Sequence, residues 1–186
     1  LVLAGCGTAS PAETVPTEAD KTDDNYRVFY EIFVGSFADS DGDGTGDLNG
    51  ILRHLDYLND GNLLSDTSLG VQGLWLTPIF ASPSYHKYDA TDYYRIDSDF
   101  GTEDDLRALL DACHARNVKV ILDLVINHTA RNHEWFQSFC QSHADANPDG
   151  PYYDYYSWYT GETLPAGITC EKIPGTADEY YECNFS

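Results

Sequence analysis

The hydrophobic pattern alternates along the chain between strand-like runs and helical spacing, beginning near Tyr26. The segment 27–34 is β-branched and aromatic, which predicts a buried strand. Apolar residues then recur on one face of a predicted helix, at Leu48, Ile51, Leu52, Leu55 and Leu58. A second strand is predicted over 71–76, and a long loop should follow from 79 to about 101.

A second helix and a third strand complete this periodic part. Thr102 with Asp105 resembles a capping box, and inward-facing residues follow at Leu106, Leu109, Leu110 and Cys113. Segment 118–126 is mostly apolar and predicts a strand, with Asp123 near its end. From Thr129 onward the periodicity vanishes, so we expect a long irregular excursion, a kind of segment that tends to be functional.

The predicted order β-α-β-α-β favours an α/β fold with a parallel sheet, because apolar strands alternate with amphipathic helices. Right-handed crossovers of this kind build either a doubly wound sheet or an eight-fold barrel. A complete barrel needs roughly 250 residues. The chain has 186 residues, and three strand–helix steps can be counted in it.

Charge narrows the class of ligand. The composition is 42% hydrophobic and 13% aromatic, too apolar for a disordered chain. Ten basic and 31 acidic residues give a net charge of -21, which argues against nucleic-acid binding and disfavours anionic membranes and anionic substrates. A neutral sugar is indifferent to this charge, whereas divalent cations are attracted by it.

The first residues resemble the end of a bacterial lipoprotein signal, with Leu-Ala-Gly before Cys6. Because the chain lacks Met and starts at Leu1, we expect the natural N-terminus to lie upstream. Residues 1–6 would then be the signal end with Cys6 as lipid-attachment site, and 7–25 a disordered tether. This predicts an extracellular protein anchored to the bacterial cell surface, with membrane contact only through the lipid.

The other cysteines divide into two groups. Cys113 falls inside a helical pattern and is most simply a buried free thiol. Cys140, Cys170 and Cys183 share one loop-rich stretch, and in an oxidising compartment two of them could pair. Three cysteines cannot all pair among themselves, so the connectivity stays open.

An acidic, glycine-rich loop runs from 39 to 47. Carboxylates at alternate positions allow one loop to wrap its oxygens around calcium, which takes six to eight oxygen ligands. The candidate ligands are the side chains of Asp39, Asp41, Asp43 and Asp47 and the carbonyl of Thr45. The first half matches an EF-hand, but Gly50 stands where an EF-hand requires a bidentate Glu. An acidic turn without metal is the alternative.

Two further polar segments follow predicted strands. Asp-Leu-Val-Ile-Asn-His at 123–128 ends the third strand, where polar groups of a barrel face the active site. The Tyr-rich segment 84–94 lies on the loop after the second strand, which opens on the same face. Aromatic rings can stack on sugar faces, and carboxylates accept hydrogen bonds from hydroxyls.

Together the three polar segments resemble the α-amylase family of glycoside hydrolases, over nearly all of the ordered chain. Segment 39–47 resembles the family's first-loop calcium site, and 123–128 resembles its first signature region. Segment 84–93 resembles the stretch His-Gly-Tyr-Asp-x-x-Asp-Tyr, with Lys87 replacing the usual Gly.

The resemblance implies the first three strand–helix units of a (β/α)8 TIM barrel over 26–128 and part of the irregular domain B over 129–186. It implies a retaining hydrolase of α-1,4-glucosidic bonds in starch-like glucans, whose catalytic carboxylates follow strands four and five. No catalytic residue is therefore assigned within this chain, and the resemblance places neither Glu31 nor Asp123 in the catalytic pair.

Site roles also come from the resemblance. Tyr88, Asp89 and His128 should contact a neutral α-glucan or maltooligosaccharide, and Asn127 with domain B should contribute to a second calcium site. A monomer is expected. The alternatives are an exo-acting α-glucosidase or oligo-1,6-glucosidase, or a non-catalytic carbohydrate-binding relative.

Overall fold

The computed structural model describes residues 27–62 and 64–183. The predicted signal end at 1–6, with Cys6, and the predicted tether at 7–25 lie outside the described residues. Within the described ranges, the helices are all too short or too polar to cross a bilayer.

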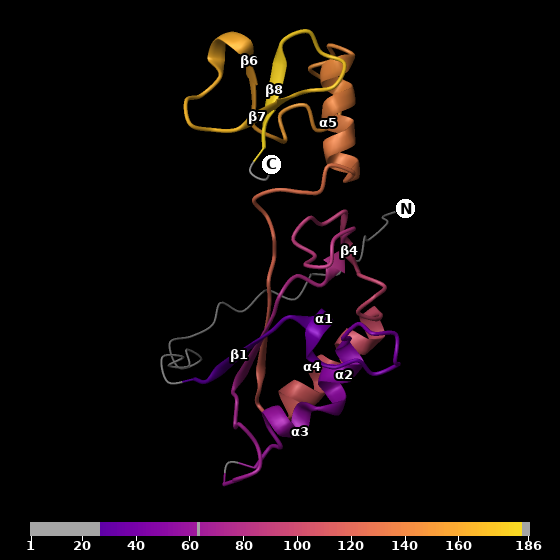
Figure 1. Ribbon diagram of the computed structural model, residues 1–186, viewed down its shortest axis with the longest axis vertical. Helices are drawn as coiled ribbons and strands as arrows, with labels where there is room; N and C mark the ends of the chain where they lie inside the picture. Colours follow the sequence, from indigo (N-terminus) through magenta and orange to yellow (C-terminus); the bar gives the residue numbers. More distant parts are fainter. Residues whose placement is uncertain (1–26, 63, 184–186) are drawn as a thin grey trace, which may run out of the picture.

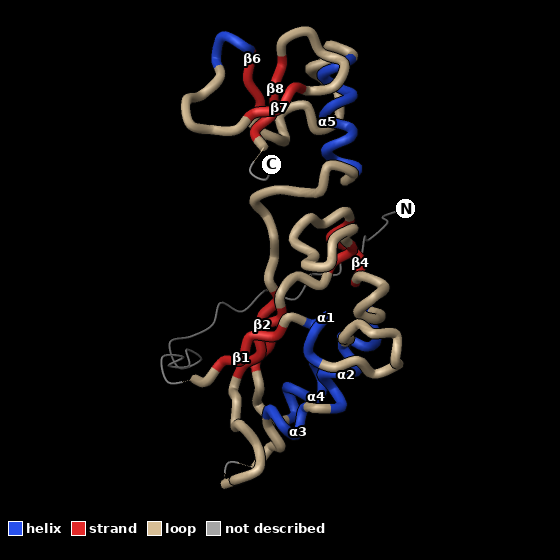
Figure 2. Tube along the Cα trace, in the orientation of Figure 1, coloured by secondary structure: helices blue, strands red, loops and turns tan. Residues whose placement is uncertain are grey.

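The periodic part forms the predicted parallel sheet, with strand order β1-β2-β5. Its strands are β1 (Phe29–Ile32), β2 (Gly73–Leu76) and β5 (Lys119–Leu122), shorter than their apolar runs. Both pairings are parallel and in register, so Glu31 lies beside Trp75. The crossovers contain α1 (Val34–Phe37), α2 (Leu48–Arg53), α3 (Leu55–Leu58) and α4 (Glu103–Ala115) (Figures 1 and 2).

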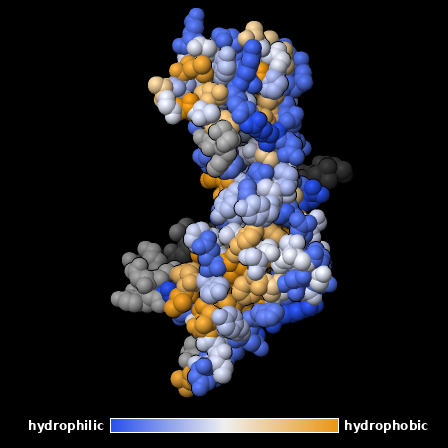
Figure 3. Space-filling view, viewed as in Figure 1, coloured by the Kyte–Doolittle hydropathy of each residue, from blue (hydrophilic) through white to orange (hydrophobic). Residues whose placement is uncertain are grey.

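These helices cover one face of the sheet. Ile32, Leu74 and Leu76 pack with leucines and isoleucines of α2, α3 and α4 into one fully buried core. The opposite face is exposed: Trp75 retains 41% of its accessible surface and Ile121 retains 45%. Hydrophobic residues consequently gather on the surface of this part of the molecule (Figure 3). The strands are apolar on both faces, and only one face is covered within the described chain.

The helix predicted over 48–58 is broken at His54. The His54 backbone N–H donates to the carbonyls of Gly50 and Ile51, and its ring nitrogen Nδ1 lies 2.9 Å from Gly50 O. A new short helix, α3, begins at the next residue. The capping box of α4 is confirmed: Thr102 Oγ1 accepts from Asp105 N, and Asp105 Oδ2 accepts from Thr102 N.

The predicted loop from 79 to 101 contains a two-stranded antiparallel sheet. Its strands are β3 (Phe80–Ala81) and β4 (Asp92–Ile96), with an irregular register between them. The loop prediction was wrong here because β3 is only two residues long and pairs with a strand about ten residues later. No local hydrophobic period marks such a pairing.

The excursion after Thr129 contains one helix and a small sheet, so the prediction of irregular chain was wrong for those elements, while the segments between them are irregular. It contains α5 (Glu134–Ala144), β6 (Trp158–Thr160), a 3-10 turn η3 (Gly161–Thr163), β7 (Cys170–Lys172) and β8 (Glu179–Glu182). The strands form an antiparallel sheet in the order β6-β8-β7. We call residues 129–183 the excursion lobe and residues 27–128 the barrel segment.

The excursion lobe has its own core, separate from that of the barrel segment. It packs one side of α5 against the sheet through Phe136, Phe139, Cys140, Ile173, Tyr181 and Cys183. The sheet and α5 of the lobe stand apart from the helices around the parallel sheet (Figure 1). An extended connection joins β5 to α5.

The cysteines sit as follows. Cys113 is a buried thiol, as predicted, and burial raises its pKa to about 11. Neither Cys140 nor Cys170 forms a disulfide in the structure. The sulfur of Cys183 instead lies 3.6 Å from a guanidinium nitrogen of Arg131.

Candidate functional site

A cavity of about 930 Å³ opens between the carboxyl end of the barrel sheet and the excursion lobe. Its walls come from the loop between β3 and β4, from the segment after β5, and from the lobe. All three predicted substrate residues line it: Tyr88, Asp89 and His128. Two polar segments that are distant in sequence therefore meet at one cavity, as parallel strands require of the loops at their carboxyl ends.

Tyr88 connects the two segments. Its hydroxyl donates to Asp123 Oδ2 at 3.0 Å, and its carbonyl lies 3.0 Å from His128 Nε2. Burial, followed by the hydrogen bond to Asp123, raises the pKa of Tyr88, so the phenol keeps its proton at neutral pH. Asp123, which directly follows β5, is thereby paired with a residue of the cavity.

Asp89 is held by hydroxyl groups. Ser82 Oγ donates to Asp89 Oδ1 at 2.7 Å, and Ser84 Oγ donates to the same oxygen. Burial alone would raise its pKa, but these two donors outweigh burial and hold the pKa of Asp89 below its ordinary value. The carboxylate is therefore ionised at neutral pH and can accept hydrogen bonds from a ligand with hydroxyl groups.

Tyr93 fixes the backbone around His128. Its hydroxyl lies 2.6 Å from the carbonyl of Val125 and 2.9 Å from the carbonyl of His128. Burial raises the pKa of Tyr93. The sequence placed Tyr93 in a Tyr-rich motif without a role, because a bond to backbone carbonyls more than 30 positions away leaves no local signal.

An aromatic cluster forms one wall of the cavity. Trp135 stacks on Tyr93, with ring centroids 5.8 Å apart, and on Tyr152, with centroids 6.0 Å apart. Tyr155 contacts the Trp135 ring edge-on. The tyrosine run at 152–159 is visible in the sequence, but no local pattern links it to its partner Trp135, which lies about 20 positions earlier. The cavity thus combines apolar ring surface with a carboxylate, Asp89, that can accept hydrogen bonds from hydroxyl groups. This combination suits a ligand that has both apolar faces and hydroxyl groups.

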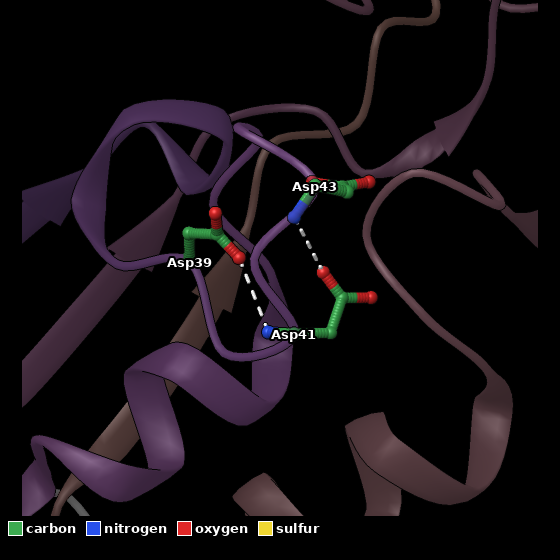
Figure 4. A group of neighbouring side chains, drawn as sticks. All are labelled: Asp39, Asp41 and Asp43. Atoms are coloured by element: carbon green, nitrogen blue, oxygen red, sulfur yellow. Dashed lines mark hydrogen bonds between the residues drawn. The ribbon is translucent and has the colours of Figure 1, made fainter.

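The acidic loop brings three of its predicted ligands together. Asp39, Asp41 and Asp43 each place a carboxylate oxygen within 4.8 Å of the others (Figure 4). Within the loop, Asp39 accepts from the N–H of Asp41, and Asp41 accepts from the N–H of Asp43. The N–H groups of Gly42 and Gly44 also donate to Asp39 and lower its pKa.

Asp47 is used differently. It is buried as the N-cap of α2, where Oδ1 accepts from Gly50 N at 2.7 Å and Oδ2 accepts from Ser40 N at 2.8 Å. These donors outweigh burial and hold its pKa below the ordinary value. Asp47 therefore lies outside the group of three carboxylates.

The loop's backbone suits a tight wrap. Gly42 and Gly44 have φ of 90° and 96°, in the left-handed region that glycine adopts without steric cost. A Cβ at Gly46 would lie 2.2 Å from the carbonyl oxygen of Val34, so the loop can pack against the backbone of α1 only with glycine there. Exposed carboxylates on such a loop are the donor set that calcium prefers.

Asn127 lies elsewhere. It is exposed and lines the cavity, and within the described residues the one potential metal-ligand group is that of the acidic loop. The structure thus places Asn127 at the candidate site and outside the group of three carboxylates.

Comparison with known proteins agrees with this geometry. Residues 31–183 match the catalytic domain of alpha amylase. The chain is 50% identical over 133 residues to alpha-amylase 3 of Dictyoglomus thermophilum, covering 72% of this chain and 24% of that protein. It is 45% identical to a trehalose synthase/amylase of Mycolicibacterium smegmatis, covering 79% of this chain and 22% of that protein.

Two further matches broaden the picture. The chain is 43% identical to an oligo-1,6-glucosidase of Heyndrickxia coagulans, covering 83% of this chain and 26% of that protein. The crystal structure of an alpha-amylase from H. orenii superposes with a TM-score of 0.70 at 45% identity, covering 83% of this chain and 32% of that one. The chain thus spans about a quarter of the length of its curated relatives, and its sheet is part of a (β/α) barrel.

Proposed function

The chain belongs to the α-amylase family, and we propose that the complete protein hydrolyses α-1,4-glucosidic bonds in starch-like glucans with retention of configuration. The observation that carries the proposal is the meeting of Tyr88, Asp89 and His128 at one cavity. In this proposal Tyr88 stacks on the sugar at the cleavage point, while Asp89 and His128 bind its hydroxyl groups. In this proposal the catalytic carboxylates follow strands four and five, outside this chain, and the residues of this chain bind and orient the substrate.

The direct test is hydrolysis by the complete protein. Starch, maltoheptaose and isomaltose are offered in parallel, and the anomer of the first product is followed by proton NMR. We expect starch and maltoheptaose to be cut with release of the α-anomer, since retention preserves the substrate's configuration. Release of the β-anomer would contradict the proposed mechanism.

Variants test the placement of the sugar contacts. Tyr88→Ala and His128→Ala in the complete protein should each lower kcat/KM for maltoheptaose by about tenfold or more, because both remove contacts that orient the substrate. Ile168→Ala is a matched control, since Ile168 is exposed and does not line the cavity. Near-normal turnover in both Tyr88→Ala and His128→Ala would refute the placement.

The second candidate is an exo-acting α-glucosidase or oligo-1,6-glucosidase. The similarity to an oligo-1,6-glucosidase favours it, at 43% identity. The same substrate set separates the two: faster cleavage of isomaltose than of starch would support the oligo-1,6-glucosidase. Absence of any hydrolysis, with maltoheptaose still bound in calorimetry, would support a non-catalytic carbohydrate-binding relative.

Calcium is the proposed cofactor. Asp39, Asp41 and Asp43 would hold the ion, with the Thr45 carbonyl and Asp47 as further predicted ligands, and the ion would stiffen the loop after β1. After chelation, calorimetry on the complete protein should show a calcium site that is lost in Asp43→Ala. Asp149→Ala, which changes an exposed aspartate outside the group, should preserve that site. Unchanged calcium binding in Asp43→Ala would contradict the site. Asn127 is the proposed contributor to a second site.

We also propose a cell-surface location, because the first six residues resemble the end of a bacterial lipoprotein signal. Such a location suits an enzyme that cuts polymeric glucan outside the cell. In this proposal Cys6 carries the lipid, residues 7–25 act as a spacer, and the protein is a monomer. The check is fractionation of cells that express the complete protein. Cys6→Ala should move it from the membrane fraction to the soluble fraction, and Cys6→Ala protein that stays in the membrane fraction would refute the anchor.

A further inference from the structure

Lys87 is a buried cation in the middle of the loop between β3 and β4. Only 4% of its surface is exposed. Its ammonium nitrogen lies 3.1 Å from Asp97 Oδ2 and 3.0 Å from Asp99 Oδ2. The carbonyl of Ser82 is 3.4 Å away, so the three N–H groups of the ammonium have three acceptors.

One acceptor of this cation, Asp97, is itself held in place. Asp97 is 6% exposed and accepts hydrogen bonds from the backbone N–H groups of Ser82 and Asp99. The ammonium also lies 5.4 Å from the centre of the Phe100 ring, which belongs to the core of the barrel segment. Lys87 therefore connects its loop, through charge and packing, to the rigid part of the fold.

The backbone at Lys87 is unusual. Its φ of 63° lies in the left-handed region, which glycine adopts freely and residues with a Cβ disfavour. The family motif that 84–93 resembles has glycine at this point. A lysine here works against the local backbone preference, and the paired ammonium supplies the interaction that holds the turn in place.

The residues beside Lys87 are those of the proposed sugar site. His86, Tyr88 and Asp89 line the cavity, whereas Lys87 is buried against Asp97. The Tyr88 N–H donates to His86 Nδ1, and the Tyr88 hydroxyl reaches Asp123. At this turn the Lys87 side chain is therefore anchored in the protein, whereas its neighbours Tyr88 and Asp89 face the cavity.

We propose that Lys87 is a positioning residue: its ammonium, held by Asp97 and Asp99, sets the turn that places Tyr88 in the cavity. The effect on sugar binding rests on the proposed function, whereas the anchoring of the turn by Lys87 is independent of that function. Burial alone would lower the pKa of Lys87, and the two carboxylates outweigh it and raise the pKa. The anchor is therefore charged throughout the neutral range.

Two variants in the complete protein separate the anchor from the backbone. Lys87→Met keeps most of the side-chain volume and removes the charge, whereas Lys87→Gly removes the anchor and relieves the left-handed backbone. Both should lower kcat/KM for maltoheptaose roughly tenfold to a hundredfold, mainly through kcat, because a displaced contact misorients the bound sugar. The control is Arg116→Met, which breaks an ion pair with Asp56 at the opposite, amino end of the sheet.

A double-mutant cycle with Tyr88→Ala tests whether Lys87 affects activity through Tyr88. If Lys87 acts through Tyr88, Lys87→Met should cost little further activity in the Tyr88→Ala background, whereas the effect of Arg116→Met should be the same in both backgrounds. Full additivity of Lys87→Met with Tyr88→Ala would overturn the inference, because it would indicate a general effect on folding. A fully active Lys87→Gly protein would overturn it as well.

Hydrogen exchange gives a readout that needs no turnover. Peptides covering 84–92 should exchange faster in Lys87→Met and Lys87→Gly but not in Arg116→Met. If the wild-type protein cuts no glucan and these peptides still respond, the proposed function fails and the anchor stands. If the wild-type protein is active and the Lys87 variants keep both wild-type exchange and wild-type kcat/KM, the function stands and the anchor fails.

Discussion

The barrel segment and the excursion lobe bury their apolar residues in opposite ways. The parallel sheet has one face packed under helices and one face open, where Phe29 keeps 42% of its accessible surface. The lobe is smaller, yet it encloses Phe139 completely between α5 and its antiparallel sheet. The barrel segment therefore leaves more apolar surface exposed than the lobe does, although its hydrophobic pattern is the more regular of the two.

The difference follows from the kind of sheet. Parallel strands joined by helices are apolar on both faces. In a barrel, one face packs against the helices and the other packs into an interior formed by all the strands. Antiparallel strands joined by short loops need one covered face, which a single helix can supply. The lobe can therefore be complete locally, whereas the open face of β1, β2 and β5 is suited to contact further barrel strands of the kind its relatives contain.

The largest expected effect concerns the 186 residues produced alone. With one face of the sheet exposed and its edge strands unpaired within the described chain, we expect poor solubility, strong binding of a hydrophobic dye, and no starch hydrolysis. The complete protein, measured beside it, should melt cooperatively and bind little dye. Measurable turnover by the 186-residue chain would contradict the placement of the catalytic carboxylates outside it.

Substitutions of Phe139 in the lobe and of Trp75 on the open face of the sheet should have different effects on stability. Phe139→Ala should destabilise the lobe by about 3–5 kcal/mol, both in the 186-residue chain and in the complete protein, because its cavity is local. Trp75→Ala should cost within about 0.5 kcal/mol in the chain alone, where the ring is exposed. In the complete protein it should cost about 3–5 kcal/mol, if further strands bury that face.

The measurement is hydrogen exchange, read separately for 134–144 and for 73–76. Equal effects of Trp75→Ala in the two proteins would show that the open face of the sheet is not part of a packed interior.

A smaller, pH-dependent effect is expected in the lobe. His133 is buried, and its Nδ1 accepts from the backbone N–H of Trp135 as the N-cap of α5. Burial lowers the pKa of His133, partly opposed by Glu134 and Asp92. The unfolded chain therefore takes up a proton at a higher pH than the folded lobe. The stability from the neutral ring is fully present above the ordinary pKa and is lost as pH falls toward the folded value.

Hydrogen exchange of α5 at about pH 7.5 and about pH 5.5, on either side of the ordinary histidine pKa, checks this. Corrected for intrinsic rates, protection should fall at the lower pH in the wild type. It should fall less in His133→Asn, which keeps a capping acceptor without titrating. His114→Asn, at an exposed histidine, is the control and should behave like the wild type. Identical pH dependence in wild type and His133→Asn would exclude His133 as the cause.

Much of the barrel segment was predictable because its signals are local. The apolar runs that became β1, β2 and β5 and the capping box of α4 can each be found within a dozen residues. The helix α5 had such a signal too: Phe136, Phe139, Cys140 and His143 follow the spacing of a helix face. The tyrosines and glycines that follow this helix are typical of irregular chain, and they obscure the spacing.

By itself, then, the sequence determined the order of parallel strands and helices, the acidic loop after β1 and the family resemblance, because these depend on neighbours along the chain. The tertiary structure decided which polar groups meet. His143 Nδ1 lies 2.8 Å from Glu179 Oε2, Tyr88 reaches Asp123, and the Lys87 ammonium finds two carboxylates behind the cavity. Such contacts join residues ten to 36 positions apart, and their partners are selected by the packing of strands and loops, which no local pattern encodes.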